Sequence, residues 1–147
     1  VRDWVELYNA CIEGVTAKHA LHICFGNLGS RPRGKRRYDW MFPEILEAKA
    51  DQFVLEYANR EMKEADLWQR FDVDRELGAG VIDIKSFYVE TPEDVAERIR
   101  ELLEFTPAEK MFINPDCGFF QLPRWISRLK LEAMVAGTRI VRQELGA

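Results

Sequence analysis

A histidine and a cysteine stand two residues apart in the apolar run LHICFGN, residues 21–27. Side chains two apart on a strand point to the same side, so the imidazole of His22 and the thiol of Cys24 would share one face. Burial in a core without a chemical role is the alternative explanation for this pair alone, because small proteins commonly bury single histidines and cysteines. The rest of the chain must decide between these explanations.

Two further side chains could complete a metal site with this pair. Cys117 would add a second thiolate, and Glu56 would add a carboxylate oxygen. Two soft thiolates, an imidazole and a carboxylate form a ligand set that tetrahedral zinc accepts. Their spacing is not that of a zinc finger, so only tertiary structure could bring them together.

Four apolar segments predict the strands that would position these side chains. The segments cover residues 17–25, 51–57, 78–86 and 110–118. Toward their ends they carry, in order, His22 with Cys24, then Glu56, then Asp83 with Lys85, and finally Cys117. The chemistry of α/β folds lies beyond the carboxyl ends of the strands, so these side chains would converge at one mouth if the sheet belongs to a barrel.

Helical periodicity predicts the elements between the strands. Helices are expected over residues 1–15, 38–50 and 91–105, and from about residue 122 to near the C-terminus. Cys11 lies on the apolar stripe of the first helix and is interpreted as a packed core thiol. Thr91 is the expected N-cap of the third helix. The charged stretch 59–75 is expected to be loop with some helix. Alternating strands and helices predict an α/β fold with a parallel sheet, either half of an eight-stranded barrel or a small open sheet.

Composition narrows the classes of protein to which the chain could belong. Its 147 residues fit one domain, and 47% hydrophobic with 31% charged residues is typical of a globular protein. The net charge of −4 argues against nucleic-acid binding as the main activity. We expect neither a membrane-spanning segment nor a signal peptide. Three widely spaced cysteines favour a reducing, cytoplasmic location.

Four segments together resemble a known family. HICFGN, ADQFVLEYANRE, GAGVIDIKS and FINPDCGF are similar, in that order, to the C-terminal half of the catalytic barrel of cobalamin-independent methionine synthases, including short relatives that consist of the barrel alone. The resemblance covers roughly residues 15–142. It implies that residues 1–147 are a single domain, the C-terminal half of a (β/α)8 TIM barrel with about four β/α units.

The resemblance also implies a chemistry and a ligand set. It implies a zinc site formed by His22, Cys24 and Cys117, with Glu56 as the fourth ligand, displaced when the substrate thiol binds as a thiolate. The implied reaction is methyl transfer to homocysteine, which forms methionine, from methyltetrahydrofolate or a methylcorrinoid. Two alternatives stay open: a related zinc enzyme that alkylates another thiol, such as coenzyme M with an epoxide, and a noncatalytic fragment with a structural zinc.

One strand departs from the family pattern. Methionine synthases carry a histidine, proposed to handle a proton, where this chain has Lys85. We expect Lys85 and Asp83 to take part in catalysis, with the lysine holding an anion or supporting a leaving group. The alternative is an ion pair between Lys85 and Asp83 or another carboxylate at the mouth. Asp116, next to Cys117, is expected to cap its turn and fix the cysteine.

A basic stretch and the unpaired edges of a half barrel are the features that bear on binding partners. The basic stretch SRPRGKRRYDW, residues 30–40, is either a lid over an anionic substrate or a solvated loop. Half a barrel would leave its first and last strands unpaired. We therefore expect the chain to be a fragment, a designed or evolved half, or a subunit that needs a partner, so that a homo-oligomer or the missing N-terminal half completes the barrel.

Overall fold

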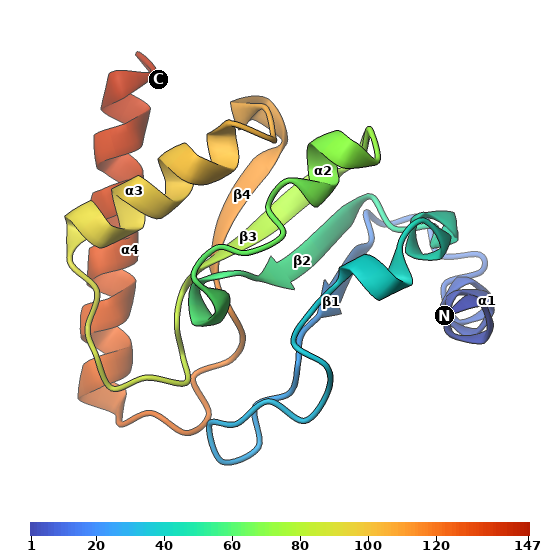
Figure 1. The fold of residues 1–147 in the computed structure, drawn as a ribbon, viewed down its shortest axis with the longest axis horizontal. Coiled ribbons are helices and arrows are strands. Elements are labelled where there is room, and N and C mark those ends of the chain that lie inside the picture. Colours follow the sequence, from blue (N-terminus) through green and yellow to red (C-terminus); the bar gives the residue numbers. More distant parts are fainter.

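The computed structural model describes all residues, 1–147, and confirms an α/β fold with a parallel sheet. Four strands lie in the order β1-β2-β3-β4, each parallel to its neighbour (Figure 1). The strands are β1 (Ala20–Ile23), β2 (Gln52–Glu56), β3 (Glu76–Ile82) and β4 (Met111–Pro115). The helices are α1 (Arg2–Cys11), α2 (Leu67–Arg70), α3 (Pro92–Leu103) and α4 (Arg124–Glu144). The sheet is not closed into a barrel, so β1 and β4 form its two edges.

The register of the strands brings their carboxyl ends to one side of the sheet. His22 pairs with Val54, Val54 with Gly78, and Gly78 with Phe112. The loops that follow the four strands therefore leave the sheet at the same end, as the sequence predicted. The two edge strands are only partly covered, because β1 and β4 contain no fully buried residue.

The core lies between the central strands and the helices. Phe53 and Leu55 of β2 are buried, and all of β3 after its first residue is buried. Helices α3 and α4 pack together beside β3 and β4 (Figure 1). The predicted N-cap of α3 is confirmed: Thr91 Oγ1 accepts from the Asp94 amide at 3.1 Å, and the Asp94 carboxylate accepts from the Thr91 amide at 2.8 Å.

The interpretation of Cys11 as a core thiol is wrong. The first helix ends at Cys11, which is exposed, and Val5 is its only buried residue. The reason is the position of α1 beyond the β1 edge of the sheet (Figure 1), where it meets the protein near residues 44–49. Its apolar stripe is therefore largely exposed, and Trp4 keeps 75% of its surface accessible.

The helix predicted over residues 38–50 is also wrong. Two short 3₁₀ turns occupy this segment, Asp39–Met41 and Glu44–Glu47. Pro43 separates them because it has no N–H and its ring clashes with the preceding turn of a helix. The charged stretch 59–75 contains the one-turn helix α2 within loop, as expected. None of the helices combines the length and apolar character needed to cross a bilayer.

Candidate metal centre

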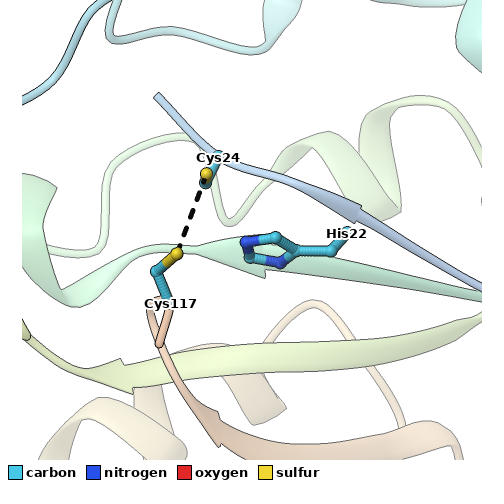
Figure 2. A group of neighbouring side chains, drawn as sticks. All are labelled: His22, Cys24 and Cys117. Atoms are coloured by element: carbon cyan, nitrogen blue, oxygen red, sulfur yellow. Dashed lines mark hydrogen bonds between the residues drawn. The ribbon is translucent and has the colours of Figure 1, made fainter. Parts of the chain in front are cut away.

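Three of the predicted ligands meet at the carboxyl end of the sheet. The ligand atoms of His22, Cys24 and Cys117 all lie within 4.8 Å of one another, and the two sulfurs are 4.0 Å apart (Figure 2). His22 belongs to β1 and Cys24 follows it directly, whereas Cys117 follows β4 at the opposite edge. Four strands side by side in a flat sheet would hold these edges about 14 Å apart. The curvature of the sheet and the two loops together close that distance.

The donor set fits a tetrahedral zinc ion. Zinc–sulfur bonds of about 2.3 Å at a tetrahedral angle place two sulfurs about 3.8 Å apart, close to the separation of Cys24 and Cys117. His22 Nδ1 lies 3.1 Å from the carbonyl of Val54. A carbonyl only accepts, so Nδ1 carries the proton and Nε2 keeps its lone pair. Figure 2 shows the far end of the imidazole ring turned toward the two sulfurs.

The thiol of Cys24 is disposed to be protonated without a metal. Burial raises the pKa of Cys24, and the nearby Cys117 and Glu56 raise it further, against a backbone hydrogen bond from Gly26 that lowers it. Zinc binds the thiolate, so its binding must release protons.

We therefore expect zinc affinity to rise steeply with pH. Two thiols that release their protons make the apparent association constant increase by about 100-fold per pH unit between about pH 6.5 and 8. Because the pKa of Cys24 is raised, its thiol still holds a proton near pH 8, and the zinc affinity should continue to increase up to that pH. Competition with a chromophoric chelator at constant ionic strength measures the slope. The exposed Cys11→Ser variant should keep it, and an affinity that does not change with pH would contradict a two-thiolate site.

Glu56 lies beside the cluster, where Lys85 holds it. Its side chain is fully buried, and its Oε2 is 2.5 Å from Lys85 Nζ, which is only 3% exposed. Glu56 Oε1 accepts from the amide of Phe25, the residue after Cys24, at 3.4 Å. The ion pair of Lys85 is thus formed with Glu56 and not with Asp83. Glu56 as the fourth zinc ligand, and Lys85 as a catalytic residue, stay predictions.

Asp83 organises the loop after β3. Its Oδ1 accepts from the Lys85 amide at 2.8 Å and from Asn59 Nδ2 at 3.2 Å. The fully buried Lys130 of α4 supports the same loop, since its Nζ donates to the Asp83 carbonyl at 2.9 Å and to Glu90 at 2.7 Å. Asp83 is not part of the three-residue cluster, and its catalytic role also stays a prediction.

Asp116 anchors the cysteine loop through a neighbouring strand. Its carboxylate is fully buried and accepts from three successive amides after β2, those of residues 57–59, at 2.7–3.1 Å. Burial raises the pKa of Asp116 to about 8, and Glu56 adds to the rise, although the three N–H donors act in the opposite direction. Gly80 leaves room for the Asp116 carboxylate, because a Cβ at position 80 would lie 2.4 Å from Asp116 Oδ1. Asp116 thus fixes the position of Cys117 relative to the loop that follows Glu56.

Tyr38 and Asn27 position the site and were not identified from the sequence. The buried Tyr38 hydroxyl accepts from the Glu56 amide at 2.9 Å and lies 3.1 and 3.2 Å from the carbonyls of Ile23 and Glu56. Asn27 Nδ2 donates to the Gly118 carbonyl at 2.8 Å, which ties together the loops that carry the two cysteines. No pattern marks either residue, because each acts through contacts distant in sequence.

Comparisons with known proteins find related sequences over almost the whole chain. Residues 8–139 match the family described as "Cobalamin-independent synthase, Catalytic domain". The chain is 43% identical over 143 residues to a methionine synthase of Saccharolobus solfataricus, and 39% identical over 144 residues to one of Sulfolobus acidocaldarius. These alignments include 96% and 97% of this chain but only 40% and 39% of the relatives, so the chain spans about two fifths of their length.

A solved structure shares the fold. It is a B12-independent methionine synthase from Shewanella sp. W3-18-1 in complex with selenomethionine, which superimposes with a TM-score of 0.82 at 30% sequence identity. The match covers 97% of this chain and 44% of that protein.

Proposed function

Because this chain belongs to the catalytic-domain family of cobalamin-independent methionine synthases, we propose that it is the zinc-binding part of an enzyme that methylates the thiol of homocysteine. The meeting of His22, Cys24 and Cys117 at one point carries this proposal. Zinc bound there would supply a Lewis acid that keeps a substrate thiol deprotonated at neutral pH. In the reaction, the sulfur attacks the methyl carbon of methyltetrahydrofolate or a methylcorrinoid, and the bond to the donor breaks with its electron pair leaving on the donor.

The residues of this chain have separate tasks in the proposal. His22 would bind through Nε2, with its ring oriented by the carbonyl of Val54. Cys24 and Cys117 would bind as thiolates and make the site rich in sulfur. The negative charge that they donate would make the bound metal a mild Lewis acid. Glu56, as a hard oxygen ligand, would be the one that leaves, and Lys85 would receive it, since the two already form an ion pair. The exposure of His22 favours an accessible centre over a closed structural one.

We also infer that residues 1–147 form the C-terminal half of a (β/α)8 barrel. The open sheet of four parallel strands supports this, as do relatives more than twice as long as the matched region. A homo-oligomer or the missing N-terminal half would then complete the barrel. A reducing, cytoplasmic location would keep Cys24 and Cys117 free as metal ligands.

Cobalt substitution tests the proposed function. Co²⁺ added to the metal-free chain should produce thiolate-to-metal charge-transfer absorption and the visible bands of tetrahedral cobalt. Homocysteine should then increase the charge-transfer band by adding a third thiolate, whereas methionine, which has no free thiol, should not. Absence of the thiolate band would exclude the metal site. A band that homocysteine leaves unchanged would indicate a closed structural site and contradict the proposed activity.

A further inference from the structure

We propose that a cavity beside Cys24 binds the carboxylate of a substrate, an inference that rests on the proposed function. The cavity has a volume of about 420 Å³ and lies between the end of β1 and the basic stretch 30–40. Cys24 lines it together with Arg33, Lys35, Arg37 and Trp40. A ligand whose sulfur or methyl group reaches the metal centre could therefore extend directly into this cavity.

The charges that line the cavity are all positive. Three cations and no acidic side chain contribute to the lining. Arg37 is already neutralised, because its guanidinium donates to both carboxylate oxygens of Asp39. Arg33 and Lys35 have no carboxylate within 4.0 Å, and the Lys35 ammonium lies 6.0 Å from the centre of the Trp40 ring. Two uncompensated cations, one of them over the ring of Trp40, suit an anion with an apolar portion.

The backbone holds Arg33 close to Cys24. The amides of Arg33 and Gly34 both donate to the carbonyl of Phe25, the residue that follows Cys24. Gly26 permits this reversal of the chain, because its φ of +92° is in the region that other residues rarely adopt, and a Cβ there would lie 3.1 Å from the Arg33 side chain. The cation is therefore attached to the metal-ligand segment itself, and the basic stretch is more than a solvated loop.

The shared chemistry of the two substrates explains what this cavity would bind. Homocysteine carries a carboxylate a few bonds from its sulfur, and methyltetrahydrofolate carries carboxylates on its glutamate portion. Either anion could bind Arg33 and Lys35 while the reacting group faces Cys24. The experiment must therefore detect anion binding first and then distinguish these two sources.

Alkylation of Cys24 in the metal-free chain tests anion binding without depending on zinc. The Cys24 thiolate forms a sulfur–carbon bond with iodoacetate or iodoacetamide, iodide leaves with the bonding electron pair, and solvent takes the thiol proton. Iodoacetate carries a carboxylate, whereas iodoacetamide is neutral. We expect Arg33→Gln with Lys35→Gln to lower the iodoacetate-to-iodoacetamide rate ratio at Cys24 by about tenfold. Peptide mass spectrometry of initial rates provides the measurement.

Two controls separate this effect from a change in net charge. Cys11 in the same molecule should keep its rate ratio. The variant Arg31→Gln with Arg142→Gln removes two charges outside the cavity and should leave the ratio at Cys24 unchanged. If the cavity variant leaves the ratio at Cys24 unaltered, or shifts it equally at Cys11, the proposal is overturned.

Protection identifies the source of the anion. α-Aminobutyrate reproduces the homocysteine skeleton without its sulfur, and p-aminobenzoylglutamate reproduces the carboxylate portion of the folate. Protection of Cys24 from iodoacetate by the first assigns the cavity to the thiol substrate, and protection by the second assigns it to the methyl donor. Protection by neither would mean that the cavity attracts anions without binding a substrate, which also overturns the proposal. Failure here would leave the cobalt result untouched, so the two proposals are tested separately.

Discussion

Replacing Cys24 or Cys117 with serine should lower the zinc affinity of this chain by at least about 1,000-fold. Each sulfur supplies one of only three clustered ligand atoms, and a serine hydroxyl is a poor ligand for zinc at neutral pH. The loss corresponds to about 4 kcal/mol, a fraction of the 10–16 kcal/mol typical of structural zinc in small proteins. Metal analysis after gel filtration with a weak chelator should show one zinc per wild-type chain and almost none in either variant.

Cys11→Ser is the matched control for this experiment. It makes the same chemical change at an exposed cysteine of α1, outside the cluster, and should retain full zinc. Full retention of zinc in either Cys24→Ser or Cys117→Ser would remove that cysteine from the ligand set. Retention in both would leave the convergence of the sulfurs without a metal-binding role.

Lys85→Met should destabilise the fold by about 3–5 kcal/mol. The substitution leaves the Glu56 carboxylate, which is fully buried, without its cation, and an unpaired buried charge carries a penalty of this size. Urea denaturation of the metal-free chain measures the free energy of unfolding. Adding Glu56→Gln to Lys85→Met removes the stranded charge and should recover at least about half of the loss.

Lys63→Met provides the comparison at the surface. Lys63 lies 3.7 Å from Glu61, and both side chains are mostly exposed, so the loss of this pair should cost less than about 1 kcal/mol. A similar small cost for Lys85→Met would contradict a buried charge pair, and the contact with Lys85 would then have no part in holding the Glu56 carboxylate.

The strands, their parallel order and the α3 cap could be predicted because they depend on local patterns. Apolar runs marked β2 and β3, and the sequence Thr91-Pro-Glu-Asp94 contains every group of its capping box. The same logic failed for residues 38–50. The apolar periodicity there predicted a helix, but Pro43 divides the segment into two short turns. It failed for Cys11 because periodicity shows that a helix has an apolar stripe and not whether a partner covers it.

The ligands could be predicted, whereas the groups that position them could not. His22, Cys24 and Cys117 have recognisable chemistry at the ends of strands. Tyr38, Asn27 and Lys130 are ordinary polar residues whose roles arise from contacts with carbonyls far away in the sequence. The partner of Lys85 was likewise undetermined, since several carboxylates were expected near the same mouth and only tertiary structure selects Glu56.

The position of the two cysteines at opposite edges of the sheet has a consequence for the unfolded chain. A single ion held by Cys24 and Cys117 would close a covalent loop across 93 positions, almost the whole sheet. Cross-links over loops of that length restrict the denatured ensemble by an amount worth about 4–5 kcal/mol if they behave like disulfides. Much of the stabilisation by metal would then arise from lost disorder in the unfolded polypeptide. Loading with zinc would raise the free energy of global unfolding.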